Sequence, residues 1–306
     1  MATRKEVKNR IASVKNIHKI TRAMEMVAAA RLRRAEQRIE NLRPYARAIR
    51  QLTRRAAEEA GDVPRVPVLE EREEVRKVGV LLVTGDRGLA GAFNTNIIRE
   101  GTRLRRELES DGAEVVFSAV GRRGESALTF RGQNLAHAYT GFTDRPAFAN
   151  AREIAEQLTA SYIDGELDRV EVVFNRYISP LTQYVWRQTL LPLQEAEVFG
   201  HGAEDEEPDE EETELEKAHK RALWVYEPEP EELLNRLIPD YVNLSVYRAL
   251  LESSASELGA RMTAMRSAAE NAQSLISDLT LEMNRVRQAE ITQEILEVVS
   301  GAEALG

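Results

Sequence analysis

The first sixty residues carry apolar side chains at the spacing of one long helix. Residues 3–59 contain no glycine and a single proline, Pro44. The apolar positions step forward by three and four residues, which places them along one helical face. They are Val7, Ile11, Val14, Ile17, Ile20, Met24, Val27, Ala35, Ile39, Leu42, Ile49 and Leu52. At 1.5 Å per residue the segment makes a helix of roughly 85 Å, which we expect Pro44 to bend or to break locally.

The clearest pattern lies near the other end of the chain, where apolar residues alternate steps of four and three. This seam is Leu258, Met262, Met265, Ala269, Ala272, Ile276, Leu279, Met283 and Val286 and, after a shift in phase, Ile291, Ile295 and Val298. Such steps mark the a and d positions of a left-handed coiled coil. We therefore predict a second long helix over about 231–304, kinked at Pro239, which pairs with the first helix into one shaft.

Between the two helices, hydrophobic runs of strand length alternate with helical segments. The predicted strands are 78–83, 113–120, 170–177, 183–191 and 221–226, and the predicted helices are 94–109, 122–130 and 145–163. We expect Asn94 or Thr95 to cap the first of these helices. The alternation predicts a parallel α/β sheet with covered faces, and the strands 170–177 and 183–191 are close enough to form a hairpin. The expected domains are 1–60, 75–228 and 229–306.

Charge is distributed very unevenly along the chain. The net charge is −9, yet residues 1–58 hold 16 Lys and Arg against 5 Asp and Glu, and residues 195–216 hold 12 acids without a Lys or Arg. The acidic loop 196–217 is predicted to be solvated and disordered. The basic first helix favours an acidic protein partner. Nucleic acid is the alternative partner. However, Tyr45 is the segment's only aromatic residue besides His18, and nucleic-acid-binding segments usually carry several aromatic or amide side chains that contact bases.

Composition narrows the possible chemistry. The chain has no cysteine, which excludes disulfides, iron–sulfur clusters and thiol catalysis. No run reaches the roughly 18 apolar residues that a membrane span needs. The four histidines lack metal-ligand spacing, so we expect no metal site; they are His18, His137, His201 and His219.

A glycine-rich turn over residues 85–91 is the strongest candidate for a nucleotide site. It follows a predicted strand and precedes a predicted helix, where a phosphate loop would lie. Its glycines, Gly85, Gly88 and Gly91, fit neither GxGxxG nor GxxxxGK[ST]. We expect a structural turn, no cofactor and no catalytic residue. A nucleotide-binding enzyme and a coiled-coil RNA-binding or scaffold protein are the rival hypotheses.

Three segments resemble the γ subunit of F-type ATP synthase, and the resemblance covers nearly the whole chain. The strongest is ITQEILEVVSGA at 291–302, which fits the family signature of Thr, Glu, a further acid and Gly-Ala. The second is KITRAMEMVAA at 19–29, and the third joins DRGL at 86–89 to NTN at 94–96. The family usually has Ser before this Asp, where the chain has Gly85.

The resemblance implies a Rossmann-like central α/β domain without catalysis, flanked by the N- and C-terminal helices as a long antiparallel coiled coil. It implies a shaft that stands inside a hexamer of α and β subunits. It also implies a foot, formed by the central α/β domain and the helix ends beside it, that sits on the c-ring beside the ε subunit. Proton-driven rotation of the c-ring would then be coupled to ATP synthesis in the catalytic β subunits. The expected location is the cytoplasmic side of the cell inner membrane, peripherally bound and without nucleic acid.

The resemblance also implies contact residues on the shaft. By position, Met24 would face an acidic lever loop of a β subunit. Arg261, Gln288, Thr292 and Glu294 would lie where the family couples rotation to catalysis. A basic face on the first helix would meet acidic loops of the stator; it is formed by Lys15, Lys19, Arg22, Arg31, Arg33 and Arg34.

The foot carries the expected c-ring contact. Trp224, Tyr226 and Glu227 match the positions that rest on the ring, although the family more often has Tyr in place of Trp224. The acidic segment 204–216 departs from the bacterial pattern and lies roughly where chloroplast subunits carry a regulatory dithiol insert. Because the chain lacks cysteine, a thiol switch is excluded, and we expect at most a weak electrostatic effect of this segment.

Overall fold

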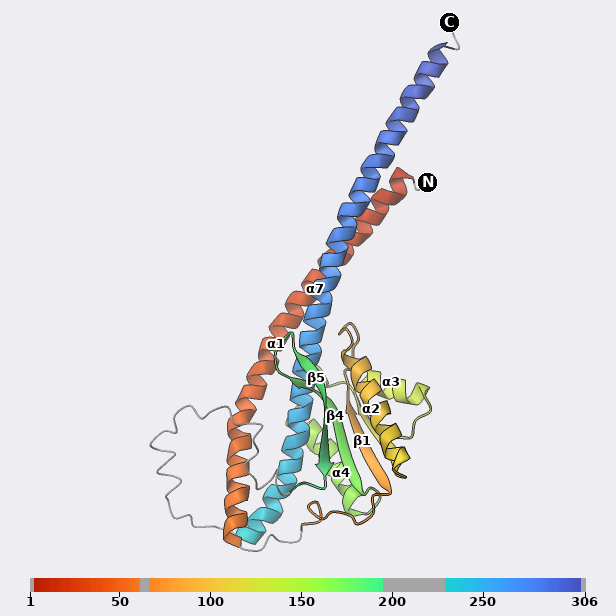
Figure 1. Ribbon diagram of the computed structural model, residues 1–306. Coiled ribbons are helices and arrows are strands. Elements are labelled where there is room, and N and C mark those ends of the chain that lie inside the picture. The colour runs from red at the N-terminus through yellow and green to blue at the C-terminus, as the bar shows by residue number, and fades with distance from the viewer. Residues whose placement is uncertain (1–2, 61–65, 195–228, 304–306) are drawn as a thin grey trace, which may run out of the picture.

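Two long helices lie side by side and antiparallel, and they form the shaft (Figure 1). The computed structural model describes residues 3–60, 66–194 and 229–303. The helices are α1 (Arg4–Ala60) and α7 (Pro230–Glu303). The expected break at Pro44 does not occur, because α1 stays helical through this exposed proline. Leu42, Ala46 and Ile49 on either side of it are half-buried or buried, so packing holds the helix across the missing hydrogen bond.

The seam of α7 confirms the pattern of fours and threes as far as Val286. The predicted continuation at Ile291, Ile295 and Val298 is wrong, because all three side chains are exposed. All nine predicted positions from Leu258 to Val286 are buried or half-buried. Near the N-terminus of α1, Val7 packs in one cluster with Ala272 and Ile276, whereas Leu32 packs with Leu258. The pairing therefore runs in opposite directions along the two helices, as an antiparallel coiled coil requires.

The predicted stripe on α1 is wrong in its middle part. Ile17, Ile20 and Val27 are more than half exposed. The buried or half-buried face instead alternates steps of four and three from Val7 to Ala56. It consists of Val7, Ile11, Val14, His18, Thr21, Glu25, Ala28, Leu32, Ala35, Ile39, Leu42, Ala46, Ile49, Thr53 and Ala56. Polar side chains thus occupy the centre of the seam, and three apolar ones are left outside it.

The central domain is built on a five-stranded sheet with the order β3-β2-β1-β4-β5. The β1–β2, β2–β3 and β1–β4 pairs are parallel, and the predicted hairpin of β4 and β5 is confirmed as an antiparallel pair. The strands are β1 (Lys77–Val83), β2 (Glu114–Val120), β3 (Leu135–Tyr139), β4 (Arg169–Tyr177) and β5 (Gln183–Leu191). The edge strand β3 was not predicted, because its short sequence mixes His137 with small residues and none of its side chains is fully buried.

Helices cover both faces of the sheet, which confirms the predicted α/β class. One face packs on α2 and α3, and the other packs on α4 and the lower part of α7 (Figure 1). These helices are α2 (Phe93–Ser110), α3 (Arg122–Phe130) and α4 (Phe148–Ile163). The predicted cap at Asn94 is wrong: Ala92 occupies the N-cap position, and Asn94 accepts a hydrogen bond from the Gly85 amide at 2.8 Å. The predicted strand 221–226 and the limit at 228 lie outside the described residues, so the domain limits stay a prediction.

Candidate functional site

The carboxyl edge of the sheet meets the shaft at a junction of three loops, which we call the joint. Its centre is Asp86, which directly follows the glycine after β1. The Asp86 carboxylate accepts hydrogen bonds from the amides of Gly141 at 2.9 Å, Thr143 at 3.2 Å and Arg122 at 3.2 Å. Burial opposes its charge, but these backbone donors outweigh burial and lower the pKa of Asp86. The glycine-rich turn is therefore fastened as a structural element.

A groove of about 610 Å³ opens between α1 and this turn, and it brings together two of the predicted site residues, Met24 and Arg261. We call it the Met24 groove. Its floor is apolar, with Ile20, Val27 and Leu89 exposed. Arginines also line it, namely Arg31, Arg87, Arg123 and Arg261. An apolar floor with arginines around it suits an acidic helix or loop that also carries apolar side chains.

Arg261 is largely engaged within the chain. Its side chain is only 10 % exposed. The guanidinium donates one hydrogen bond to the Glu257 carboxylate at 2.5 Å and another to the Gly88 carbonyl at 3.3 Å. Burial raises the pKa of Glu257 and outweighs the ion pair with Arg261, which lowers it. Glu257 was not predicted as a site residue; the available signal was an acid four residues before an arginine within the buried seam.

A second acid lies in the seam of the shaft itself. Glu25 accepts hydrogen bonds from Arg266 of α7 at 3.0 Å and from Arg22 at 2.7 Å. The hydrogen bond from Arg266 is the main reason why the pKa of Glu25 is lowered, and burial opposes it. This pair joins α1 to α7 beside the Met24 groove.

The remaining predicted shaft contacts lie far from the groove. Gln288, Thr292 and Glu294 are exposed, roughly 40–50 Å along α7 from Arg261 at 1.5 Å per residue. The Thr292 hydroxyl donates to the carbonyl of Gln288 at 2.9 Å. The structure therefore divides the predicted contact residues into a groove pair and a tip group.

The end of α7 stands alone beyond the ion pair between Arg4 and Glu290, whose charged atoms are 4.0 Å apart. We call residues 291–303 the bare tip, because α1 does not reach them (Figure 1). Residues 291–300 of the tip are all exposed. Its apolar side chains are 48–71 % exposed, and they are Ile291, Ile295, Leu296, Val298 and Val299. Exposed apolar side chains in such number mark a surface for a partner.

The other predicted contacts have two different outcomes. Every residue of the basic face is exposed, although Arg22 and Arg31 also pair with Glu25 and Asp144 of the same chain. The predicted c-ring contacts lie outside the described residues; they are Trp224, Tyr226 and Glu227.

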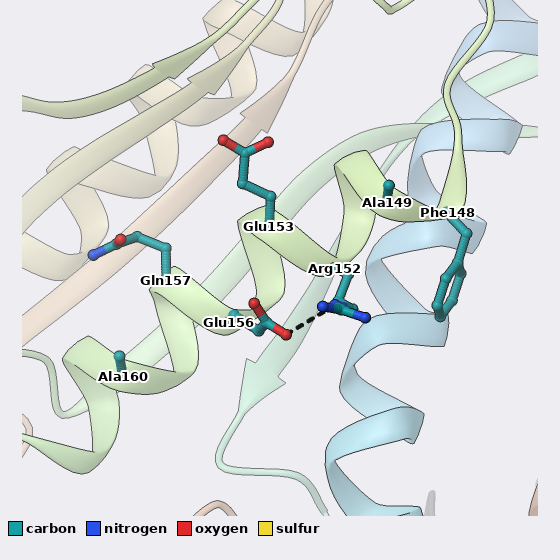
Figure 2. A pocket seen from close by; sticks show the side chains of 7 residues that line it. All are labelled: Phe148, Ala149, Arg152, Glu153, Glu156, Gln157 and Ala160. Atoms are coloured by element: carbon teal, nitrogen blue, oxygen red, sulfur yellow. Dashed lines mark ion pairs between the residues drawn. The ribbon is translucent and has the colours of Figure 1, made fainter.

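A hollow of about 600 Å³ on α4 offers little chemistry. All of its lining residues belong to that helix, and Figure 2 shows them spread along its surface without converging on one point. Arg152 and Glu156 form an ion pair at 3.0 Å, and the Glu153 carboxylate points away from them. Within the described ranges, no three acidic or histidine side chains are placed to hold a metal ion. In the same part of the chain, no helix is both long and apolar enough to cross a membrane.

Known proteins match the chain from end to end. The family profile described as ATP synthase matches residues 3–305. The ATP synthase gamma chain of Rubrobacter xylanophilus is 42% identical over 305 residues, which cover 100% of this chain and 99% of the relative. The chain belongs to the ATP synthase γ chain family.

Further members of the γ chain family are similar over the same length. The sodium-ion-specific ATP synthase gamma chain of Acetobacterium woodii is 40% identical, with 98% of each chain covered. A chain in the structure of the central stalk and c-ring of the mitochondrial ATP synthase of Tetrahymena thermophila is 28% identical. It has a TM-score of 0.58 and covers 81% of this chain and 99% of its own length.

Proposed function

We propose that the chain is the central rotor shaft of an F-type ATP synthase, which couples rotation of the c-ring to ATP synthesis in the β subunits. The observation that carries this function is the bare tip, a helix end whose apolar side chains the chain itself leaves uncovered. A sleeve formed by the α and β subunits would cover them. The foot, at the opposite end of the shaft, would rest on the c-ring with the ε subunit.

The shaft works through its asymmetry. The Met24 groove opens on one side of the coiled coil, between α1 and the foot, so the surface that the hexamer meets changes with the angle of rotation. Each angle then favours one conformation of a neighbouring β subunit over the others. Rotation thereby becomes a difference in nucleotide affinity among the three β subunits.

The contact residues take specific parts in this proposal. Met24, between the arginines of its groove, would face an acidic lever loop of a β subunit. Gln288, Thr292 and Glu294 would contact the sleeve at the tip. Arg261 would act mainly through its own chain, because its guanidinium is bound to Glu257 and to the Gly88 carbonyl.

The foot completes the assignment. Trp224, Tyr226 and Glu227 would rest on the c-ring, with the proton as coupling ion; the sodium-specific relative makes the ion a matter for measurement. We place the chain on the cytoplasmic side of the cell inner membrane, bound there only through the complex. The chain itself would be non-catalytic, because the glycine-rich turn is tied to neighbouring loops through Asp86 and Asn94.

Co-purification tests the assignment. The chain, tagged at residue 1 so that the bare tip stays free, is expressed with the α, β and ε subunits of the same organism. We expect one complex with ATPase activity that contains all four subunits. Recovery of the chain without α and β, or tight calorimetric binding of ATP or NAD to the isolated chain, would contradict a shaft without catalysis. Salt-dependent RNA binding in place of α and β binding would favour the scaffold hypothesis instead.

A further inference from the structure

The joint contains the crevice in which sheets of this kind bind their ligands. In a doubly wound sheet, ligands lie outside the carboxyl ends of the strands, at the point where successive connections leave in opposite directions. The order β3-β2-β1-β4-β5 places this point between β1 and β4. The segment that follows β1 there is Thr84, Gly85 and Asp86.

A carboxylate of the shaft fills this crevice. A Cβ atom on Gly85 would lie 2.7–2.8 Å from the three carboxylate atoms of Glu257, so only a residue without a side chain lets the carboxylate approach this closely. Glu257 is 1 % exposed. Its counterion is Arg261 of the next helical turn, which also holds the Gly88 carbonyl of the same loop.

The turn of α7 before Glu257 is fastened to the same edge of the sheet by hydroxyl groups. Each of these hydrogen bonds runs from a serine to a backbone carbonyl of the α/β domain. They join Ser253 to Val83 at 3.1 Å, Ser254 to Asp144 at 3.4 Å and Ser256 to Asn175 at 3.2 Å. These acceptors lie at the end of β1, in the loop before α4 and in β4. These hydrogen bonds therefore reach both β1 and β4, the two strands between which the ligand crevice lies.

We propose that residues 253–261 of α7 form a polar clamp, in which the Glu257 carboxylate is an internal anion that occupies the ligand crevice of the α/β domain. The clamp fixes the foot to the shaft against twisting, a role that rests on the proposed rotor function. Apolar contacts are non-directional and allow sliding, whereas hydrogen bonds to fixed carbonyls resist it.

The energetics of Glu257 support a role other than stability. Burial outweighs the attraction of Arg261 and raises the pKa of Glu257, and the nearby carboxylates of Asp144 and Asp86 raise it further. The folded protein thus holds this charge at a cost. A neutral side chain of the same shape would remove the cost and, with it, the ion pair that ties Arg261 to the crevice.

Chemical rescue tests the internal anion on the isolated chain. Glu257→Ala opens the crevice and leaves Arg261 without its carboxylate, so sodium formate should raise the midpoint of thermal unfolding by at least about 2 °C above sodium chloride of equal ionic strength. The wild type should not respond. Glu252→Ala is the matched control, because Glu252 is also buried and pairs with an arginine on α7, at 2.8 Å from Arg248. An equal response of all three proteins, or no response of Glu257→Ala, would overturn the internal anion.

Coupling tests the clamp in the assembled complex, with Glu257→Gln as a variant of the same shape. We expect it to unfold at the same or a higher temperature at neutral pH, yet to pump several-fold fewer ions per ATP hydrolysed. Glu252→Gln should pump as the wild type does. If the wild type couples and Glu257→Gln couples equally well, the clamp is wrong. If the wild-type complex itself shows no coupling, the proposed function fails instead.

Discussion

The paired shaft and the bare tip contain similar apolar side chains, which are buried in the shaft and exposed in the tip. Along the seam, residues such as Leu258, Ile276 and Leu279 are buried against α1 or the foot. In the tip, residues such as Ile295 and Val298 are exposed by more than half. Both stretches belong to one helix, α7. The difference separates the residues that the chain needs in order to fold from those that await a partner.

The largest expected effect is the loss of stability when a buried side chain of the seam is truncated to alanine. Leu258→Ala removes a side chain that is 2 % exposed and should lower the free energy of unfolding by about 3 kcal/mol. Leu281→Ala, the same change at an exposed site of α7, should stay within about 0.5 kcal/mol. Urea unfolding of the isolated chain measures both. Equal effects at the two sites would show that the seam does not hold the shaft together.

Truncation after Val286 tests the function of the bare tip. It removes the bare tip and residues 287–290, including the partly exposed Glu290 partner of Arg4, but leaves the seam up to Val286, so the isolated chain should unfold at nearly the same temperature as the full-length chain. In the complex, the shaft should lose torque because the sleeve has less surface to engage. Torque is measured from the rotation rate under viscous load. Full torque with normal assembly would mean that the exposed apolar residues have no part in function.

Met24→Lys separates the groove from the fold. Met24 is only half-buried, so its replacement should change stability by less than about 1 kcal/mol. A new cation against an acidic partner should nevertheless impair coupling between ion flow and ATP synthesis. Met26→Lys is the control, because Met26 is 60% exposed and does not line the groove. Equal coupling in the two variants would count against a stator contact at Met24.

The smallest effects are those of pH on the two buried acids, Glu25 and Glu257, each of which pairs with arginine. The pKa of Glu25 is lowered in the folded protein, so this pair stabilises above the unfolded pKa, and the stabilisation is lost as pH falls through the folded value. The pKa of Glu257 is raised, so its contribution is greatest below the unfolded pKa and is lost as pH rises through the folded value.

Thermal unfolding of the two glutamine variants across pH checks this contrast. At neutral pH, Glu25→Gln should unfold at a lower temperature than the wild type, whereas Glu257→Gln should not. In acid, below the pKa of Glu25 in both the folded and the unfolded protein, the difference in unfolding temperature between Glu25→Gln and the wild type should shrink. A deficit that is independent of pH would show that the charge of Glu25 does not stabilise the shaft.

Much of the fold follows from local patterns in the sequence. The seam of α7 was predicted correctly from Leu258 to Val286, because its alternating steps leave one face to bury. Its predicted continuation at Ile291, Ile295 and Val298 was wrong, because α1 does not extend to that part of α7. The seam of α1 was misplaced at Ile17, Ile20 and Val27, because spacing does not reveal which of two apolar stripes the chain covers itself. Glu25 takes the buried position instead, where it pairs with the nearby Arg22 and with Arg266, 241 residues away in the sequence.

The site was less predictable than the fold for the same reason. Met24 and Arg261 were each found by resemblance, but their meeting in one groove depends on tertiary packing. Glu257 was missed because its role comes from the position of Gly85, far away in the sequence, at the carboxyl end of β1. The contacts at 224–227 lie outside the described residues and stay predictions.

Single-molecule rotation tests the central claim most directly. The chain has no cysteine, so Phe130→Cys at the exposed end of α3, where Phe130 is 92% exposed, provides a unique attachment point on the foot. With the α and β hexamer fixed to glass and a bead on this residue, ATP should drive the foot in one direction, with a dwell for each of the three β subunits. ATP hydrolysis at a normal rate with a stationary foot would contradict the account.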